Sequence, residues 1–199
     1  MPKHEIFFLV FSYFLGAIPF GYILCYLTDK KDIRQEGSGN IGATNVLRTK
    51  GKIFGLITLA LDMLKGILPI LYGLTHFDSP VLIFAGGAAA ILGHLYSVYL
   101  KFKGGKGVST FLGMMAVFHF PSALAFGGVF FFTYFLTRYI SASSIAGVTA
   151  VFFFILFTNV MEVSMMVFVI GILIITKHRG NIQRMIDGTE PQLIWKKNG

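Results

Sequence analysis

The sequence is poor in cysteine, in acidic residues and in charge of either sign. Cys25 is the single cysteine among 199 residues, so no disulfide or thiolate metal cluster can form within the chain. Only 13% of residues are charged, whereas 55% are hydrophobic and Phe alone occurs 22 times. A soluble domain of this length has too little interior for so many large apolar side chains. The composition therefore predicts an integral membrane protein, in which Cys25 serves packing only.

Seven apolar segments alternate with polar parts of the chain. A spanning helix needs about 20 apolar residues, which the first three segments provide easily. The others are shorter, and residues 108–119 form the weakest. Pro121 is expected to break the chain between the fourth and fifth segments. We expect an all-α integral membrane protein with seven transmembrane helices in one domain, residues 1–199; five helices with a hairpin of short helices is the alternative. The segments are residues 5–27, 53–74, 80–100, 108–119, 122–140, 143–160 and 163–177.

The positions of Lys and Arg predict how these segments are oriented across the membrane. Seventeen Lys and Arg against nine Asp and Glu leave a net charge of +8. With seven crossings, the loops at 75–80, 119–121 and 158–162 carry no Lys or Arg. The positive-inside rule then predicts an N-terminus outside, with Lys3, and a cytoplasmic C-terminus. Membrane orientation and small anionic substrates explain the cations, so no nucleic-acid partner is expected. The cytoplasmic cations are Lys30, Lys31, Arg34, Arg48, Lys50, Lys52, Lys101, Lys103, Lys106, Arg138, Lys177, Arg179, Arg184, Lys196 and Lys197.

The polar segments that can carry chemistry all fall on this cytoplasmic side, at about 28–52, 100–110, 137–144 and 177–199. In the first, three glycines match the G-x-G-x-x-G spacing, but no buried strand precedes them, which excludes a dinucleotide fingerprint. We expect a flexible loop there; an interfacial turn with a snorkelling arginine is the alternative. The loop presents Ser38, Asn40, Thr44, Asn45 and Arg48.

The second segment carries glycines around a lysine immediately before an apolar helix. Its spacing is not that of a Walker A loop. Gly104, Gly105 and Gly107 nevertheless allow backbone N–H groups to converge, and Lys106 adds charge. Helix N-termini with exposed amides bind phosphate well. We therefore expect a phosphate site here rather than a plain basic loop.

Two further cytoplasmic segments carry single polar groups of interest. His178 and Asn181 are three residues apart and would share a helix face. Ser143 stands near the start of another helix, where either it or Ser141 can be an N-cap, and a functional hydroxyl is the equal alternative. Within the second apolar segment, an aspartate and a lysine three apart can neutralise one another or act in function. They are Asp62 and Lys65.

Taken together, these segments resemble the acyl-phosphate:glycerol-3-phosphate acyltransferases (PlsY-type) of bacterial membranes over essentially the whole chain. The resemblance rests on motifs in one order. They are residues 38–45 (SGNIGATN) with Arg48, Gly93 and His94 followed by residues 101–107 (KFKGGKG), and residues 178–181 (HRGN) with 188–190 (GTE). It implies transfer of a fatty acyl group from acyl phosphate to glycerol 3-phosphate, which gives lysophosphatidic acid and phosphate. This is the first step of phospholipid synthesis, at the bacterial inner membrane with the site facing the cytoplasm.

The residues fit that chemistry. None of the five histidines has an aspartate five positions later, which argues against a His/Asp dyad acting on a thioester donor. An acyl phosphate already has a good leaving group, so no covalent nucleophile, metal or cofactor is expected. We expect His178, Asn181 and Ser143 to be catalytic. Substrate binding falls to Ser38, Asn40, Thr44, Asn45, Arg48, His94, Lys101, Gly104, Gly105, Lys106 and Gly107.

Within that site, Arg48 is expected to grip the phosphate of glycerol 3-phosphate, and Lys106 that of the donor. His178 and the substrate's own phosphate are both candidates for the general base. A transporter of a phosphorylated metabolite is the competing function, although transporter sites lie near the bilayer midplane. A non-catalytic lipid-binding protein is a third, without a feature of its own. Membrane lipid is an expected partner, and chain-length preference and oligomeric state stay open.

Overall fold

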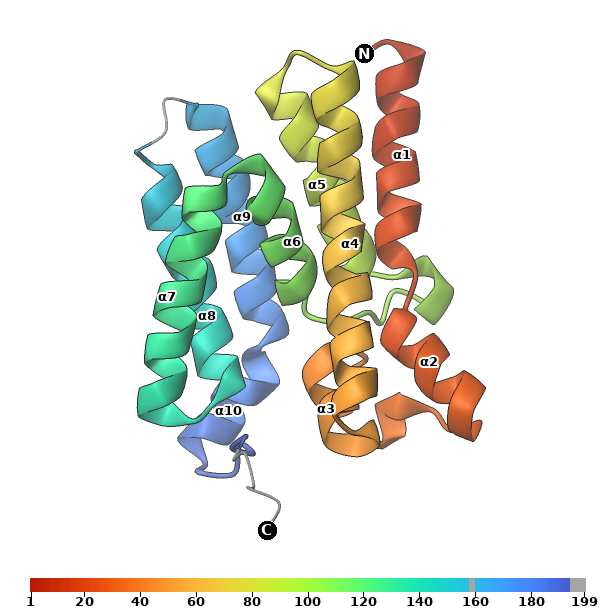
Figure 1. Ribbon diagram of the computed structural model, residues 1–199, viewed down its shortest axis with the longest axis vertical. Helices are drawn as coiled ribbons and strands as arrows, with labels where there is room; N and C mark the ends of the chain where they lie inside the picture. The colour runs from red at the N-terminus through yellow and green to blue at the C-terminus, as the bar shows by residue number, and fades with distance from the viewer. Residues whose placement is uncertain (158–159, 194–199) are drawn as a thin grey trace. The chain divides into compact units, whose positions relative to one another are not determined.

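The computed structural model describes residues 1–157 and 160–193, all of them in helices, turns or loops (Figure 1). The predicted all-α class is therefore confirmed. Lys196 and Lys197, part of the 158–162 loop and the end of the tail lie outside the described residues. The helices are α1 Lys3–Ala17, α2 Phe20–Asp29, α3 Ala43–Lys50, α4 Lys52–His76, α5 Pro80–Leu95, α6 Val108–Phe118, α7 Phe120–Thr137, α8 Ile140–Ile155, α9 Met161–Lys177 and α10 Arg179–Ile186, with 3₁₀ turns η1 Ile33–Gln35 and η2 Val98–Leu100.

All seven apolar segments are helical, but their lengths differ. Among the described residues, four helical stretches are long and apolar enough to cross a membrane, or five if the bent pair α9 and α10 counts as one span. The helices α6 and α8 are shorter. Pro121 does mark a break, since α6 ends at Phe118 and α7 begins at Phe120. Seven crossings therefore stay a prediction.

The first apolar segment is not one straight helix. It divides into α1 and α2 at Ile18 and Pro19. Proline has no N–H to donate to the preceding turn and disfavours helical backbone in the residue before it. Ile18 is accordingly extended, with ψ of 118°. The break lets α2 leave the line of α1, and α2 then packs against α3 and α4.

The chain forms two compact units, Met1–Phe120 and Pro121–Gly199. In the first unit, α1, α4 and α5 run side by side (Figure 1). Glycines allow their backbones to approach closely, as is typical of membrane helices. A Cβ at Gly16 of α1 would collide with the backbone of Ala90 in α5. In the second unit, α8 packs against α9, and α10 contacts both.

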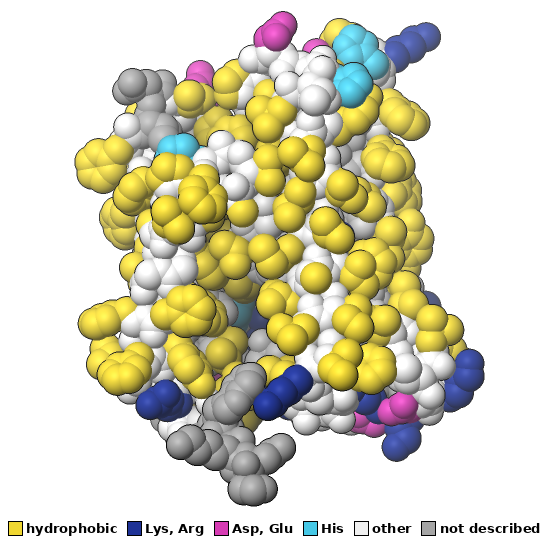
Figure 2. All heavy atoms as spheres, viewed as in Figure 1, with side chains coloured by type: hydrophobic (Ala, Val, Ile, Leu, Met, Phe, Trp, Pro, Cys, Tyr) yellow, Lys and Arg dark blue, Asp and Glu magenta, His cyan; other side chains and the backbone are white. Residues whose placement is uncertain are grey.

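Hydrophobic side chains cover the visible lengths of α4 and α7 (Figure 2). Many of these side chains are large and exposed, including Leu56, Leu64, Phe131 and Phe135. In water this exposure would be costly, at roughly 25 cal/mol for each Å² of apolar surface. In each unit the visible Lys and Arg lie mainly near one end, that of α3 in the first and of α10 in the second (Figures 1 and 2). Each unit thus has the surface of a membrane-embedded bundle.

Candidate active site

The segment expected to be a flexible loop is ordered by one buried amide. Asn45 lies on α3, and its Nδ2 donates to the carbonyl oxygens of Glu36 (3.0 Å) and Asn40 (2.9 Å). Its Oδ1 accepts from the N–H of Ser38 at 2.8 Å. Asn45 is only 2% exposed. Its side chain therefore holds the segment in shape, and its polar groups are directed at the protein's own backbone.

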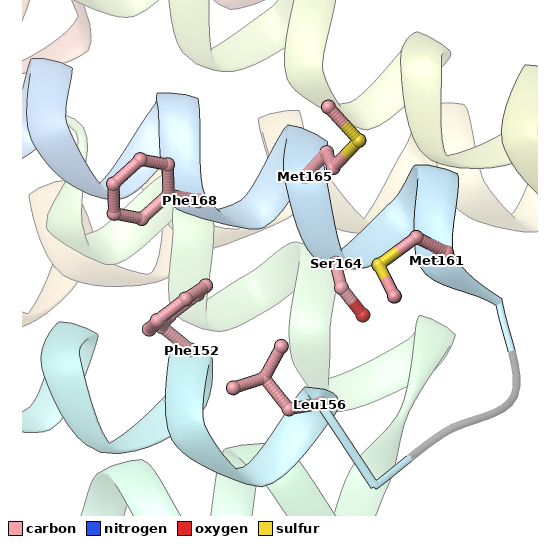
Figure 3. Close-up of a pocket in the computed structure, with 6 residues that line it drawn as sticks. All are labelled: Phe152, Leu156, Met161, Ser164, Met165 and Phe168. Atoms are coloured by element: carbon pink, nitrogen blue, oxygen red, sulfur yellow. The ribbon is translucent and has the colours of Figure 1, made fainter.

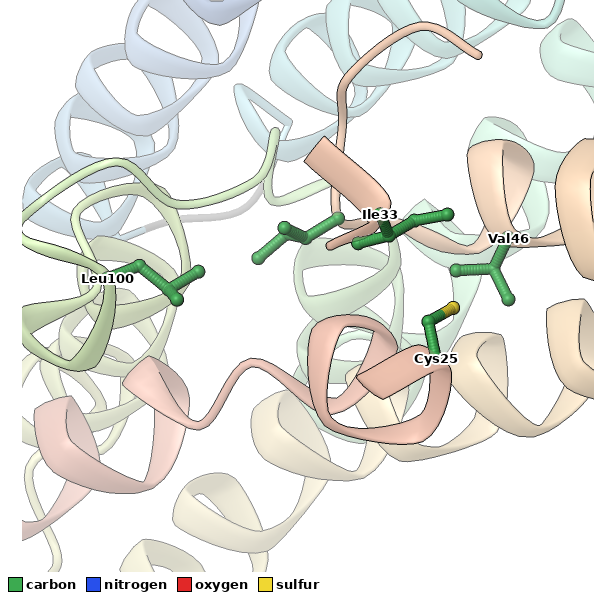
Figure 4. Close-up of a cluster of buried hydrophobic side chains, with 5 residues drawn as sticks. Cys25, Ile33, Val46 and Leu100 are labelled. Carbon is green, nitrogen blue, oxygen red and sulfur yellow. The ribbon is translucent and has the colours of Figure 1, made fainter. Parts of the chain in front are cut away.

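The second half of that segment is helical, which corrects the expectation of a loop through residue 48. Helix α3 buries Val46 in a hydrophobic cluster that also contains Cys25, Ile33, Ile41 and Leu100 (Figure 4). Burial against this cluster stabilises a helix that is too short to be stable alone. Cys25 is a free, buried thiol in the cluster, which agrees with the packing role expected for it. Leu100 comes from η2, so the cluster also anchors the chain that leads to the glycine-rich turn.

Thr44 and Arg48 lie four residues apart on α3 and share a face, and both are half-buried. Neighbouring cations are paired with carboxylates. Lys50 forms ion pairs with Asp29 and with Glu36, the latter at 3.6 Å. The hydrogen bond with Asp29 raises the pKa of Lys50. Arg34 pairs with Asp32 at 2.6 Å, a hydrogen bond that lowers the pKa of that aspartate.

The glycine-rich turn packs closely on His94 at the end of α5. The N–H of Gly105 donates to the carbonyl oxygen of His94 at 2.9 Å. A Cβ at Gly104 would collide with that carbonyl, and one at Gly105 would collide with His94 Nε2. Gly107 has a φ of 81° and precedes α6 as its N-cap. The Gly105 amide is thus bound within the protein, so of the backbone N–H groups that were expected to converge on a phosphate, this one already has an acceptor.

Other groups around the turn have the features of an anion-binding site. Helix α6 begins at Val108, directly after the turn as expected, and its first N–H groups have no acceptor within the helix. Lys106 is half-buried and Lys101 is exposed. The backbone of Lys101 and Phe102 is left-handed, with φ of 53° and 62°. Such strain is uncommon outside glycine and concentrates at functional sites.

Helix α6 begins beside the middle of α4, well away from its ends (Figure 1). A Cβ at Gly66 would collide with the carbonyl oxygen of Thr110 in the first turn of α6. Gly66 is the fifteenth residue of the 25-residue α4. The glycine-rich turn therefore enters the bundle rather than lying at the end of it.

A charged cluster lies buried in the first unit. Lys65 Nζ is 2.7 Å from Asp62 Oδ1, which confirms that these residues can neutralise one another. The contact is an ion pair rather than an aligned hydrogen bond. The same Nζ lies 3.2 Å from His94 Nδ1 and 5.1 Å from the centre of the Phe20 ring. Asp62, Lys65 and His94 are all at most 4% exposed.

In the second unit, the buried carboxylate of Glu190 organises the polar groups. Its Oε1 accepts from Asn181 Nδ2 at 2.6 Å and from Ser141 Oγ at 2.8 Å. Its Oε2 accepts from Arg184 Nε at 2.8 Å. Burial raises the pKa of Glu190, but these three hydrogen bonds and the charge of Arg184 outweigh it and lower the pKa overall. Glu190 is therefore a carboxylate at neutral pH.

His178 and Asn181 are both buried at the junction of α9 and α10, which bends by 54°. His178 Nδ1 lies 2.8 Å from the carbonyl oxygen of Ile174. Ser143 is buried on α8, and its Oγ donates to the carbonyl oxygen of Tyr139 at 2.8 Å. Neither Ser141 nor Ser143 is the N-cap of α8, because Tyr139 occupies that position, and its own side chain makes no capping hydrogen bond.

The site residues thus fall into separate groups. The first unit places Ser38, Asn40, Thr44 and Arg48 around α3, and His94 beside residues 104–107. The second places Asn181 next to Ser141 and Glu190, with His178 and Ser143 nearby in sequence. Sequence reasoning missed Ser141, Arg184 and Glu190 as site residues, although Glu190 belongs to the motif at 188–190. It also did not connect His94 with Lys65, because no local pattern predicts a contact between residues 29 apart.

One pocket lies between α8 and α9, lined by Phe152, Leu156, Met161, Ser164, Met165 and Phe168 (Figure 3). Ser164 is its one polar lining residue, and its hydroxyl donates to the carbonyl oxygen of Ile155 at 3.2 Å. None of the described residues that line the pocket is titratable, so they offer no charged group to a phosphate.

Solved structures of one integral membrane enzyme share this fold. A crystal structure of PlsY (YgiH), an integral membrane glycerol 3-phosphate acyltransferase, in its glycerol 3-phosphate form, matches with a TM-score of 0.92 and 39% identity, covering 96% of each chain. Its lysophosphatidic acid form matches with a TM-score of 0.88 and 38% identity, again over 96% of each chain. The fold is that of an integral membrane acyltransferase.

Sequence comparison gives the particular family. The glycerol-3-phosphate acyltransferase family model matches residues 6–188. The glycerol-3-phosphate acyltransferase of Brucella anthropi is 41% identical, covering 93% of this chain and 91% of its own. That of Mesorhizobium japonicum is 42% identical, covering 93% and 94%. The chain belongs to the glycerol-3-phosphate acyltransferase family, and the resemblance drawn from its motifs is confirmed.

Proposed function

We propose that this chain transfers a fatty acyl group from acyl phosphate to glycerol 3-phosphate, giving lysophosphatidic acid and inorganic phosphate. The observation that carries this proposal is its similarity, over 96% of both chains, to a PlsY crystal structure described as the glycerol 3-phosphate form. The form described with lysophosphatidic acid supports the product. The missing His/Asp dyad supports acyl phosphate as donor.

The reaction needs no covalent enzyme intermediate. A hydroxyl oxygen of glycerol 3-phosphate attacks the acyl carbonyl carbon and forms the ester bond. The bond from that carbon to the phosphate oxygen breaks, and phosphate leaves with the electron pair. The hydroxyl proton passes to a base. Positioning of the reactants and stabilisation of charge on the carbonyl oxygen can supply much of the rate.

Phosphate recognition falls to the first unit. Arg48 is our candidate for the acceptor phosphate, because a guanidinium binds phosphate through two parallel hydrogen bonds. Lys106 and the first N–H groups of α6 suit the donor phosphate. Ser38, Asn40, Thr44 and Lys101 are candidates for further contacts.

The second unit carries the groups proposed to act on the hydroxyl and the carbonyl. Asn181 and Ser143 would orient these groups. Asn181 is itself oriented by Glu190, which accepts from its Nδ2. For the base we keep two candidates, His178 and the phosphate of the substrate. Asn45 contributes to the site by fixing the conformation of the segment at 36–48, because its side chain hydrogen-bonds to the backbone of that segment.

We further propose that the chain is one domain of seven crossings in the bacterial inner membrane, with its N-terminus outside and its C-terminus and site facing the cytoplasm. The charge distribution supports this orientation, because the positive-inside rule places Lys and Arg on the cytoplasmic side. Cysteines introduced at positions 31 and 78 in a Cys25→Ala background, labelled with a membrane-impermeant thiol reagent in intact cells, test it. Labelling at 78 and not at 31 is expected, and the reverse pattern would refute the orientation.

Purified protein in detergent, given palmitoyl phosphate and glycerol 3-phosphate, tests the reaction. Both lysophosphatidic acid and inorganic phosphate should appear, in equal amounts. Palmitoyl-CoA and palmitoyl-acyl carrier protein serve as alternative donors and should give no product. Turnover with a thioester but not with palmitoyl phosphate would overturn the proposed donor.

A further inference from the structure

We propose that one exposed surface of the first unit binds anionic phospholipid headgroups of the membrane. The surface combines the C-terminal end of α2 with the turn at 98–103, and it carries apolar side chains beside lysines. We call it the interfacial surface, and it consists of Leu27, Lys30, Lys31, Tyr99, Phe102 and Lys103, all of them exposed. The inference goes beyond acyl transfer and does not rest on it.

The two parts of this surface are joined by their buried sides. Cys25 of α2 and Leu100 of η2 belong to the same hydrophobic cluster (Figure 4). Ser97, which precedes η2, donates from its Oγ to the carbonyl oxygen of Ala17 at 2.5 Å. The N–H of Phe102 in turn donates to the carbonyl oxygen of Ser97 at 2.7 Å. The turn is therefore fixed beside α2, and the exposed side chains of both share one surface.

The apolar members place this surface at the edge of the membrane. Leu27, Tyr99 and Phe102 are 65%, 55% and 60% exposed. The ring of Tyr99 lies 6.5 Å from that of Phe14, which belongs to a helical stretch apolar enough to cross a membrane. Lysines begin two residues after Tyr99. Aromatic rings collect where the hydrocarbon gives way to headgroups, so these side chains contact lipid rather than a soluble protein.

The lysines determine which headgroups are preferred. Lys30, Lys31 and Lys103 are exposed, and none of them forms an ion pair within residues 1–157 and 160–193. The carboxylates that flank Lys30 and Lys31, those of Asp29 and Asp32, are each paired with another cation. A lysine near an anionic membrane surface contributes about 1 kcal/mol to the attraction. A zwitterionic headgroup has no net charge, so the lysines favour an anionic one.

The backbone conformation is a further sign that these side chains serve a partner. Among the described residues, four that are not glycine have a positive φ, and three of them are Lys30 (58°), Lys101 (53°) and Phe102 (62°). Glycine takes this conformation freely, whereas in another residue it costs roughly 1–2 kcal/mol. Packing within the protein offsets little of this cost for exposed side chains. Contact with lipid offsets it, because the Phe102 ring can enter the hydrocarbon while the lysines on either side reach lipid phosphates.

Tryptophan fluorescence in vesicles tests the headgroup preference. Phe102→Trp is made in the full chain with Trp195→Phe, so that position 102 carries the single tryptophan. Two sets of vesicles contain phosphatidylcholine with about one-fifth phosphatidylglycerol, whose negative charge attracts basic side chains. Bromine, which quenches tryptophan on contact, is on the acyl chains of the phosphatidylglycerol in one set and of an equal amount of phosphatidylcholine in the other. The two sets therefore have the same headgroups and the same bromine content.

Brominated phosphatidylglycerol should quench the Phe102→Trp protein at least about twofold more than brominated phosphatidylcholine, because the lysines enrich the anionic lipid there. The control is Phe131→Trp in the same background, an exposed position within α7, where both lipids should quench equally. Equal quenching by the two lipids at position 102 would overturn the preference. Quenching by neither lipid would place the ring in water, facing a soluble partner, and would overturn the lipid proposal.

Lysine substitutions assign the preference to this surface. Lys30→Gln, Lys31→Gln and Lys103→Gln together should reduce the excess quenching at position 102 to that of the control position. Lys3→Gln, which removes an exposed cation at the start of α1, should leave the excess unchanged. An excess that survives the triple substitution would overturn the role of these lysines.

A second measurement uses the chain without an introduced tryptophan. Native mass spectrometry of the protein from micelles with equal amounts of the two lipids should show more bound phosphatidylglycerol than phosphatidylcholine. The triple lysine variant should lose that difference. Equal retention of the two lipids by the unsubstituted chain would overturn the proposal, even if Phe102→Trp failed to fold. Neither measurement uses turnover, so the outcome is independent of the proposed acyl transfer.

Discussion

His178 Nδ1 lies 2.8 Å from the carbonyl oxygen of Ile174, one helical turn earlier. A carbonyl oxygen only accepts, so Nδ1 carries the proton and the neutral ring has its lone pair on Nε2. His178 therefore has the tautomer that a general base requires. The same bond fixes the ring at the bend between α9 and α10.

If His178 is the base, kcat should show an acid limb, because protonation of the imidazole removes the base. His178→Ala should then abolish that acid limb and lower kcat by roughly 10²–10⁴-fold. A pH profile of kcat for both proteins measures this. His119→Ala, which changes a histidine at the opposite end of α6 from the glycine-rich turn, is the control and should keep the wild-type profile.

The substrate phosphate has a second pKa of about 6, so the wild-type profile alone does not separate the two bases. A phosphonate analogue of glycerol 3-phosphate moves that pKa and leaves the protein unchanged. If the acid limb moves with the analogue in wild type and in His178→Ala alike, the substrate is the base. A limb that ignores the analogue and vanishes with His178 identifies the histidine.

Substitution of Arg48 and substitution of Lys106 should produce different kinetic defects. Each charge-assisted hydrogen bond contributes roughly 1.5–3 kcal/mol, so a substitution that removes more than one should lower kcat/KM by about a hundredfold. Arg48→Ala should act mainly through the KM of glycerol 3-phosphate, and Lys106→Ala through that of acyl phosphate. Steady-state kinetics with each substrate varied in turn would show this. Arg34→Ala, whose guanidinium pairs with Asp32, is the matched control. Identical defects for both substrates would contradict this division.

Glu190→Gln should lower the Tm of the protein at neutral pH. The pKa of Glu190 is below that of an unfolded carboxyl, so its stabilising effect is present above the unfolded pKa, about 4.3, and is lost as pH falls through the folded value. The difference in Tm between wild type and variant should therefore hold from pH 7 down to about 4.3 and shrink only as the pH is lowered further. Thermal unfolding in detergent across this range measures it.

The control for that experiment is Glu162→Gln, which changes an exposed carboxylate at the start of α9 in the same unit. Its Tm should stay within about a degree of wild type at every pH, since exposed charges contribute little. A Glu190 variant that matched wild type at pH 7 would show that the contacts with Asn181, Ser141 and Arg184 add nothing to stability.

Asn45→Asp should loosen the segment at 33–45 with little change in side-chain size. Aspartate keeps an oxygen for the Ser38 N–H but loses the donor to Glu36 and Asn40. It also places an acceptor against their carbonyl oxygens, at a cost of about 1–3 kcal/mol for unsatisfied groups. Hydrogen exchange at Ser38 and Gly39 should accelerate at least tenfold. Asn40→Asp is the control, because Asn40 uses its Oδ1, as acceptor from Gly42, and aspartate keeps that acceptor.

Several features followed from local patterns in the sequence. The apolar segments became helices, Pro121 separated α6 from α7, and α6 began directly after Gly107, because helix length, proline and glycine act on the chain within a few residues. The division at Pro19 was missed because the apolar run continues through it. Helix α3 was missed because its stability comes from burial of Val46 against residues distant in sequence.

The sequence by itself determined the class of this protein. Its apolar segments require a membrane, its cations predict an orientation, and its motifs identify the family. Only the tertiary structure decided which partner each polar group contacts. Asn45 hydrogen-bonds to backbone groups, the Glu190 carboxylate accepts from three side chains, and Lys65 lies against His94. The physical reason is the sequence separation over which each interaction acts. Hydropathy and helix signals are read along the chain, whereas a buried polar group finds its partner wherever packing brings one, at separations that no local pattern records.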